Sequence, residues 1–254
     1  MTSRYAVSLN NIALSSLSNK ILILDVQYSS PEMRTDTLTL AKRHGARVYR
    51  QYIAGSSVTI LFEIHEYGIS QRQSILDSVN NWAKNGGALE TNDRTGQQLK
   101  CVCTSFPAIT SVRGWTEPLS ITFSAYELPF WTEKNAVTLT LTGTSDSGTL
   151  LVPGNFDSAL VEAEITTNAA LSSVSLTVNG QTLSLTDLSI ASGSVITISY
   201  DEKMIQSIKV SGVSLFPNRS GVDDLLAKCG ENNIISISAS ADVTVVFSVK
   251  GVWL

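Results

Sequence analysis

The feature that most constrains the fold is one long amphipathic helix in a chain whose other segments have the pattern of short strands. Ser70 and Gln73 have the S-x-x-Q spacing of a capping box, so we expect the helix to begin near Gln71 and to run for about 14 residues. Its apolar face comprises Ile75, Leu76, Val79, Trp82 and Ala83, while Arg72, Asp77, Asn80 and Lys84 point elsewhere. A single apolar face predicts a helix that covers one side of a sheet.

The first half of the chain is otherwise expected to form an antiparallel sheet or barrel. Alternating apolar and polar residues predict strands at residues 5–9, 21–28, 35–42, 58–65, 99–103, 109–115 and 119–126. Residues 127–135 break this pattern with Pro129 and several charges. We therefore expect an N-terminal α+β domain at residues 1–132 and a second domain at residues 133–254.

The second half has the pattern of a β-sandwich, so the whole chain is expected to be mainly β. Strands are predicted at residues 137–141, 160–165, 174–178, 183–185, 195–200, 205–210, 234–239 and 243–249. Asn179-Gly180 predicts a type I′ hairpin turn, because both residues tolerate a positive φ. Residues 221–230 are expected to form a turn or two of helix that ends at Gly230.

The composition indicates an unusually uncharged surface. Charged residues make up 16% of the chain, against about 25% in typical soluble domains. Two explanations stay open, namely a surface that partners cover and a Ser/Thr-rich β protein whose strands prefer those residues. The net charge of -4 gives no support to specific nucleic-acid binding. Because no signal peptide and no apolar run of ~20 residues is visible, we expect cytosolic synthesis and no membrane span.

Two groups of acidic residues resemble catalytic pairs at first sight. His65 lies between Glu63 and Glu66, but on a strand only Glu63 shares its face, so a polar strand surface is favoured. Glu162 and Glu164 share a strand face, whereas the carboxylates of a glycosidase usually face each other across a cleft. No common catalytic motif is present, and we expect the protein not to be an enzyme.

The three cysteines give little support to a disulfide or a metal site. Cys101 and Cys103 lie two residues apart on one strand face, too far apart for a relaxed disulfide. Cys229 is distant in sequence, and only His44 and His65 could complete a metal site. We therefore interpret the cysteines as small buried apolar residues, and we expect no metal and no cofactor.

A basic run around Gly45 is the strongest candidate for a surface contact. It comprises Lys42, Arg43, His44, Arg47 and Arg50, with Tyr49 and Tyr52 nearby. A contact with an acidic neighbouring subunit is the favoured interpretation, a solvated loop comes second, and nucleic-acid binding comes third because the chain is acidic. Lys42, Arg43, Arg47 and Arg50 are the candidate subunit-interface residues.

The order of these segments resembles the distal tail proteins of long-tailed bacteriophages. The first half carries "FEIHEYGISQRQSILDSVNNWA" (residues 62–83) before a strand that ends in "FSAYELPFW", and it resembles the N-terminal domain of that family. The second half carries "LVPGNFDSALVEAEI" (151–165), "ITISYDEK" (196–203) and "DDLLAKCGENNIISIS" (223–238), and it resembles the family's galectin-like sandwich. The resemblance spans nearly the whole chain and rests on order and spacing.

The resemblance implies a structural role in a phage tail tip or baseplate. It implies a homo-hexameric ring that joins the tail tube protein to the hub or fibre protein, in a virion assembled in the cytoplasm of the host bacterium. The helix would then buttress the ring-forming sheet, and the second domain would dock a receptor-binding protein or, as an alternative, a carbohydrate. A free adhesion module and a glycan-cleaving enzyme are the competing functions.

The second domain departs from sugar-binding galectins, because both histidines of the chain lie in the first half and the galectin sugar signature needs one. "FPNR", residues 216–219, is only a fragment of such a site. Asn218, Arg219 and Trp253, the only tryptophan of this domain, are the candidate carbohydrate or partner contacts.

Overall fold

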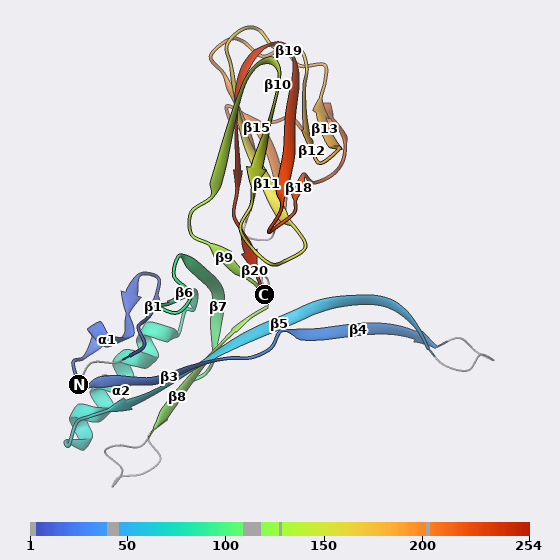
Figure 1. Cartoon of the computed structure of the whole chain (residues 1–254). Helices are drawn as coiled ribbons and strands as arrows, with labels where there is room; N and C mark the ends of the chain where they lie inside the picture. Colours follow the sequence, from blue (N-terminus) through green and yellow to red (C-terminus); the bar gives the residue numbers. More distant parts are fainter. Residues whose placement is uncertain (1–3, 40–45, 109–117, 127–128, 202–203) are drawn as a thin grey trace. The chain divides into compact units, whose positions relative to one another are not determined.

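The structure is a computed structural model that describes residues 4–39, 46–108, 118–126, 129–201 and 204–254. The chain divides into two compact units, unit 1 (Met1–Trp131) and unit 2 (Thr132–Leu254). Both units are built mainly from antiparallel strands, which confirms the predicted mainly β fold class (Figure 1). The expected strand at residues 109–115 lies outside the described residues.

Unit 1 is an antiparallel sheet in which strands far apart in sequence become neighbours. Its order is β2-β1-β6-β7-β8-β5-β3, with β4 paired to β5. The bounds are β1 (Val7–Leu9), β2 (Ile12–Ala13), β3 (Ile21–Tyr28), β4 (Glu32–Thr39), β5 (Ala46–Ile64), β6 (Gly87–Thr91), β7 (Gln97–Ser105) and β8 (Leu119–Ala125). The core side of β5 and β8 carries fully buried Ile60, Phe62, Ile121 and Phe123. The residues between them, Leu61 on β5 and Thr122 on β8, are only half-buried, as the period of a strand requires.

The long helix α2 (Ile69–Ala83) begins two residues earlier than predicted, and its cap is different. Gly68 is the N-cap, and no side chain caps the helix there. The predicted capping box at Ser70 is therefore wrong. The carboxylate of Glu66 instead accepts hydrogen bonds from the backbone N–H groups of Tyr67 and Gly68, at 2.9 and 3.4 Å. This acidic group just before the helix holds the chain in the turn that leads into it.

The buried face of α2 agrees with the predicted face only in part, because Ile75 and Trp82 are half-buried. Leu76, Val79 and Ala83 are buried as expected, but Arg72, predicted to point elsewhere, is also buried, with 3% of its surface exposed. The ring of Trp82 meets that of Phe123 edge to face, at 5.8 Å between centroids. The Trp82 indole N–H donates to the carbonyl of Ile12, at 2.9 Å. The helix is therefore fixed to the sheet at both β8 and β2.

A second, one-turn helix also lies in the described part of unit 1. This helix, α1 (Leu14–Leu17), directly follows β2, and its first residue Leu14 is fully buried. The sequence did not predict α1, because one turn of helix is too short to produce a periodic pattern.

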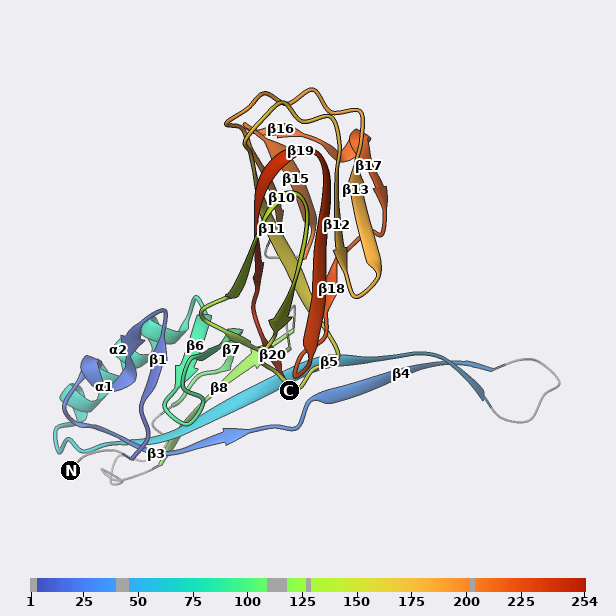
Figure 2. The same cartoon turned by 45° about the horizontal axis from the view of Figure 1, so that its top comes forward.

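The longest strand of unit 1, β5, has two different environments along its length. Residues Ser56–Phe62 pair with β8, and Val58–Ile64 pair with β3 on the other side. Residues 46–55 pair with β4, from Glu32↔Gly55 to Thr39↔Ala46. We call this two-stranded ribbon, β4 with residues 46–55 of β5, the arm. Both views show the arm running outward from the rest of the unit 1 sheet (Figures 1 and 2).

Unit 2 is a strongly curled antiparallel sheet whose two halves face each other as a sandwich (Figure 2). Its order is β16-β15-β14-β11-β19-β12-β13-β17, with β10 paired to β19 and β18 to β11. The bounds are β10 (Val137–Leu151), β11 (Ala159–Thr167), β12 (Val174–Val178), β13 (Gln181–Leu185), β14 (Val195–Tyr200), β15 (Gln206–Val210), β16 (Val213–Ser214), β17 (Arg219–Gly221), β18 (Leu226–Ala227) and β19 (Asn232–Val249). The short β9 (Trp131–Glu133) spans the division between the units, and β20 (Val252–Trp253) ends the chain.

Strand β19 connects the two halves of the sandwich. Two separate strands were predicted at 234–239 and 243–249, but the structure has one continuous strand. Its first part pairs with β12 and its second part with β11, while β10 follows nearly its whole length. The pattern of the sequence breaks at Ser240 because the strand passes from one half of the sheet to the other there.

Two local predictions for unit 2 have opposite outcomes. The type I′ turn is confirmed, since Asn179 and Gly180 have φ of 50° and 83° and join β12 to β13. The helix predicted at residues 221–230 is wrong. Leu225 accepts a backbone hydrogen bond from Val161, and Leu226 and Ala227 pair with β11 as strand β18. An isolated turn of helix is only marginally stable, so strand pairing that also buries Leu225 is preferred.

Candidate interface surfaces

The basic residues predicted to form one loop occupy two kinds of position. Lys42 and Arg43 lie outside the described residues. Arg47 and Arg50 lie on strand β5 in the arm, so the prediction of a single loop from 42 to 50 is wrong. Arg50 is exposed, and its guanidinium carbon lies 5.0 Å from the centroid of the Tyr52 ring. Arg50 is also the cross-strand partner of Asp36 on β4, which brings opposite charges together across the ribbon.

The arm exposes apolar side chains as well as charges. Met33 on β4 and Val48 on β5 are 54% and 58% exposed. Glu32 and Arg34 form an ion pair at 3.0 Å whose two side chains are both more than half exposed. A two-stranded ribbon is marginally stable by itself, and its outer backbone groups can pair with another chain. The arm therefore has the chemistry of a contact surface.

Asn218 and Arg219, predicted as partner contacts, are engaged inside unit 2. Asn218 ends the short helix η1 (Phe216–Asn218), and its side-chain amide donates to the carbonyls of Thr186 and Asp187, at 3.0 and 3.1 Å. The guanidinium of Arg219 donates to Gln206 Oε1 at 3.1 Å and forms a close ion pair with Asp223. These polar groups hold the β17 edge of the sheet together.

Trp253 lies in a different contact from the other two predicted residues. Its indole N–H donates to Glu133 Oε1 at 3.0 Å, and its side chain is half-buried. Glu133 lies on β9, and Trp253 lies on β20, so this bond ties the two ends of unit 2 together. Trp253 shares no hydrogen-bond partner with Asn218 or Arg219 among the described residues. The three residues therefore do not form one site.

A cluster of aromatic and charged residues in unit 1 was missed by the sequence analysis. The Tyr28 hydroxyl lies 2.6 Å from Asp93 Oδ1 and 2.9 Å from Thr91 Oγ1. The Arg94 guanidinium lies over the rings of Tyr28 and Trp131, at 5.1 and 4.9 Å from their centroids. These residues come from β3, the turn after β6 and the start of β9, so no local motif could reveal the cluster.

The cluster shifts the protonation of its two acidic groups in opposite directions. Burial, followed by the hydrogen bond to Asp93, raises the pKa of the Tyr28 hydroxyl. Burial would also raise the pKa of Asp93, but hydrogen bonds from Tyr28 and Thr91 outweigh it and lower that pKa. The pair is thus held as a neutral phenol that donates to a carboxylate. This arrangement stabilises the structure and leaves Asp93 unsuited to act as a general acid at neutral pH.

A surface pocket of about 370 Å³ lies beside this cluster in unit 1. Its lining residues come from β1, β2, β6 and the 92–97 turn, and they include Glu90 as the one carboxylate and Arg94 as the one cation among the described residues. A glycosidase requires two carboxylates on either side of the bond to be cleaved. The pocket does not have that arrangement.

The acidic pairs considered from the sequence also have structural partners. His65 Nε2 lies 2.9 Å from Glu63 Oε2, so the two residues share a strand face as predicted. The backbone N–H of Tyr200 donates to Glu162 Oε1 at 3.3 Å, and Glu164 is exposed on the outer face of β11. Both groups are explained by polar contacts on a strand surface.

The cysteines are free thiols in protected positions. Burial, and to a smaller extent the charge of Cys103, raises the pKa of the Cys101 thiol to about 12, and burial also raises the pKa values of Cys103 and Cys229. Such thiols are poor nucleophiles and poor metal ligands. Across the described ranges, no group of three His, Cys, Asp or Glu residues could hold a metal ion. None of the helices in the described part of the chain has the length and hydropathy needed to cross a bilayer.

Comparison with known proteins gives structural matches only. No protein-family model matches the sequence, and no curated protein matches it either. The structure, however, matches the crystal structure of the SPP1 phage Dit protein with a TM-score of 0.72 at 12% sequence identity, over 97% of this chain and 98% of that one. The chain has the Dit fold. The SPP1 protein is described as a paradigm of the hub adsorption apparatus in phages that infect Gram-positive bacteria.

Chains of the phage P2 baseplate in its activated conformation are also similar. One, from the structure with Ca, matches with a TM-score of 0.45 at 9% identity, over 99% of this chain and 98% of that chain. Another, from the structure with Sr, matches with a TM-score of 0.44 at 9% identity, over 97% of both chains. The match to the SPP1 Dit protein, which includes both units of this chain, confirms at the level of the fold the resemblance to distal tail proteins inferred from segment order.

Proposed function

We propose that the protein is a structural, non-enzymatic component of a phage tail tip or baseplate. The observation that carries this proposal is the full-length match to the Dit fold, which includes both units. The acidic and cysteine groups described above have structural partners or raised pKa values, which supports a role in assembly over one in catalysis. The protein would be part of the virion tail after assembly in the host cytoplasm.

The finer proposal is a homo-hexameric ring formed by unit 1. A closed ring with cyclic symmetry needs two different complementary patches on each subunit, because each contact is head to tail. The arm supplies one patch, since it offers unpaired strand edges together with the exposed side chains of Met33 and Val48. Such a ribbon gains stability when its edge pairs with another sheet and its apolar side chains are covered. We infer that each arm lies against the neighbouring subunit.

The basic residues of the 42–50 segment would guide this contact. Lys42, Arg43, Arg47 and Arg50 are close in sequence, and the chain as a whole has a net charge of -4. A basic segment on an acidic protein favours approach to an acidic surface of the neighbouring subunit or of the stacked tail tube. Charges at the edge of an interface act mainly on association rate and orientation, whereas the apolar and backbone contacts supply the affinity.

Unit 2 is proposed as a docking module that the ring displays. The ring would join the tail tube protein on one side to the hub or fibre protein on the other, and unit 2 would hold a receptor-binding protein. The polar groups of three candidate residues, Asn218, Arg219 and Trp253, form hydrogen bonds within unit 2. These bonds weaken the alternative of a carbohydrate-binding module. Glycan-array screening of the full chain tests that alternative, and reproducible binding that Trp253→Ala abolishes would favour it.

Assembly of the full chain tests the ring proposal directly. Light scattering and negative-stain electron microscopy should show hexameric rings at high concentration or in the presence of the tube protein. Reversal of Arg43, Arg47 and Arg50 to Glu should abolish the rings while circular dichroism shows an intact fold. A wild-type chain that stays monomeric beside its tail partners would contradict the ring, whereas intact rings in the variant would contradict only the role of the basic residues.

A matched control separates the arm from a general effect of charge. Lys209 and Lys250 are exposed residues of unit 2, and Lys228 carries a half-exposed surface ion pair with Glu231. Reversal of these three lysines to Glu changes the net charge by the same amount as the arm variant. Rings should persist in this control. Equal loss of rings in both variants would show that total charge, rather than the arm, controls assembly.

A further inference from the structure

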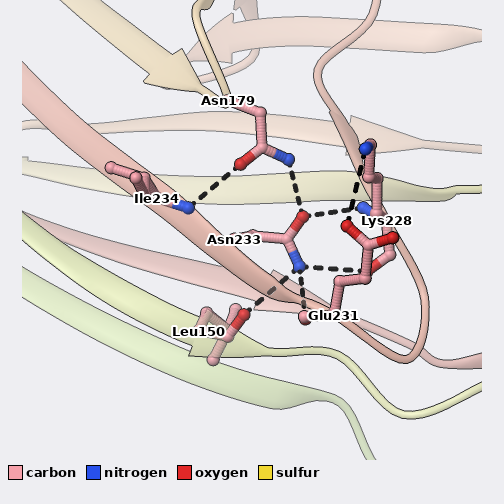
Figure 3. Close-up of polar contacts among 6 residues, drawn as sticks. All are labelled: Leu150, Asn179, Lys228, Glu231, Asn233 and Ile234. Atoms are coloured by element: carbon pink, nitrogen blue, oxygen red, sulfur yellow. Dashed lines mark hydrogen bonds and ion pairs between the residues drawn. The ribbon is translucent and has the colours of Figure 1, made fainter.

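A buried asparagine links four segments of unit 2. Asn233 is fully buried, and its Oδ1 accepts hydrogen bonds from the Asn179 side-chain amide and the Lys228 backbone N–H, both at 2.7 Å (Figure 3). Its Nδ2 donates to the carbonyls of Leu150, Lys228 and Glu231, at 3.2, 3.0 and 3.0 Å. Every polar atom of this side chain therefore has a partner, and the amide cannot turn over without losing them.

The same network holds both ends of the Asn179 side chain. Its Nδ2 donates to Asn233, as described, and its Oδ1 accepts a hydrogen bond from the backbone N–H of Ile234, at 3.0 Å (Figure 3). Asn179 is followed by Gly180 in an exposed turn, and a Cβ built on Gly180 would meet nothing within 4 Å. An Asn-Gly pair in an open turn is thus combined with a carboxamide that is held in one orientation.

Asn-Gly is the dipeptide in which the backbone most easily attacks its own side chain, because glycine has no Cβ to shield its nitrogen. The Gly180 nitrogen loses its proton to water and forms a bond to Asn179 Cγ, while the Cγ–Nδ2 bond breaks and ammonia leaves. Water then opens the resulting succinimide, giving aspartate or isoaspartate at position 179. The overall reaction consumes one water and releases ammonia, with no change in oxidation state.

We propose that Asn179 is a latent deamidation site that Asn233 and Ile234 keep unreactive in the folded protein. The attack requires the carboxamide to rotate toward the Gly180 nitrogen, and this rotation breaks both side-chain hydrogen bonds. Each hydrogen bond of ~1.4 kcal/mol that must be broken slows the reaction about tenfold. Folding therefore protects a turn whose sequence favours the reaction.

Deamidation of Asn179 would break the hydrogen-bond network around Asn233. A carboxylate at position 179 would place an acceptor oxygen against Asn233 Oδ1, where the amide N–H now donates at 2.7 Å. Asn233 cannot offer a donor instead, because its Nδ2 is committed to three carbonyls. Isoaspartate would also lengthen the backbone of a turn whose register is fixed by the Val178↔Gln181 pair. Deamidation would thus release the turn from the loop that carries Lys228 and Glu231.

The chain contains a second Asn-Gly pair that serves as an internal control. Asn85 is exposed at the end of α2, and the backbone N–H of the following Gly86 donates to the carbonyl of Ala83 at 2.9 Å. Here the attacking nitrogen is held by the helix end, and Asn233 takes no part. A change at Asn233 should therefore affect the reaction at Asn179 and leave that at Asn85 unchanged.

Peptide mapping by mass spectrometry of the full chain, aged at mildly alkaline pH, tests the proposal. Both Asn-Gly sites should deamidate in urea, and Asn179 should react at least about tenfold more slowly in the folded protein. Asn233→Ala should raise the rate at Asn179 by about tenfold and leave the rate at Asn85 unchanged. Equal rates at Asn179 in the folded and unfolded chain, or no acceleration in a folded Asn233→Ala variant, would overturn it.

A product mimic keeps the proposal testable if Asn233→Ala does not fold. Asn179→Asp should lower the thermal midpoint of unit 2 by at least about 4 °C, because it places two acceptors against each other. Asn85→Asp makes the same chemical change at the control site and should leave the midpoint unchanged. Equal midpoints for Asn179→Asp and wild type would contradict the predicted loss of the network.

Discussion

The arm of unit 1 and the β10–β19 strand pair of unit 2 are both long antiparallel ribbons, but among the described residues only β10–β19 has a buried side. In β19, Ile235, Ile237, Val243, Val245 and Phe247 are buried and alternate with more exposed residues. In β4, residues 32–37 are exposed without alternation. Strand pairing does not by itself make a two-stranded ribbon stable. The β10–β19 pair belongs to a larger sheet, whereas among the described residues the arm consists of its two strands alone.

The largest effect on stability should come from the buried side of the β10–β19 strand pair. Phe247 is fully buried in the core of unit 2, so Phe247→Ala should cost about 3–5 kcal/mol of unfolding free energy. Denaturant melts of the full chain measure this loss. The control Phe106→Ala removes a ring that is 48% exposed and should cost less than about 0.5 kcal/mol. Similar losses in the two variants would contradict the assignment of the core.

Truncation of Trp82 on helix α2 of unit 1 should lower the unfolding free energy somewhat less. Trp82→Ala removes the edge-to-face contact with Phe123 and the hydrogen bond to Ile12, and it should cost about 3 kcal/mol. Trp82→Phe keeps an aromatic ring but has no indole donor, so it should cost only about 1 kcal/mol. Urea melts of the two variants separate these contributions. If Trp82→Ala changed the unfolding free energy by no more than the experimental error, α2 would not support the sheet next to β5.

The Tyr28–Asp93 bond should give a pH-dependent effect of about 1 kcal/mol at neutral pH. The folded-state pKa of Asp93 is lowered, so the folded state binds fewer protons than the unfolded state near the ordinary carboxyl value of 3.8. The stabilisation is therefore present above that pH and is lost as the pH falls through the folded-state pKa. Tyr28→Phe should show a smaller loss of stability between pH 5 and pH 2 than wild type. The same loss of stability between pH 5 and pH 2 in Tyr28→Phe and wild type would contradict this role of the Tyr28–Asp93 bond.

The smallest effect on monomer stability should come from the arm. Val48 and Val58 lie on the same strand, 58% and 1% exposed. Val48→Ser should change the unfolding free energy by less than about 0.5 kcal/mol, whereas Val58→Ser should cost about 2–4 kcal/mol. Val48→Ser should nevertheless weaken the proposed ring, as light scattering can measure. A large loss of monomer stability from Val48→Ser would show that the arm is supported within its own chain.

The sequence predicted the elements that have a buried face. Strands 21–28, 174–178 and 195–200 have the predicted bounds, because their alternating residues face a core. The start of α2 was placed late because Glu66 and Gly68 form the turn before the helix, whereas Ser70 only resembles a capping residue. The arm was interpreted partly as a loop since a ribbon without a buried face leaves no apolar periodicity to detect.

The candidate contacts were harder to predict than the fold. Arg47 and Arg50 were recognised as basic, but their position on a strand depends on pairing with β4. The Tyr28, Asp93 and Trp131 cluster joins residues from distant parts of the chain, and no spacing in the sequence indicates such a contact. Asn179-Gly180 was recognised as a turn, whereas the protection by Asn233 depends on packing between distant strands.

The continuity of β5 has a mechanical consequence. The strand runs continuously from Ala46 in the arm to Ile64, and its residues 58–62 pair with both β3 and β8. Backbone hydrogen bonds in antiparallel sheets lie perpendicular to the strands. A pull on the arm along β5 therefore loads both flanking ladders in shear, so that many bonds resist together and none opens first. A force on the arm is thus transmitted to the strands in the core of unit 1.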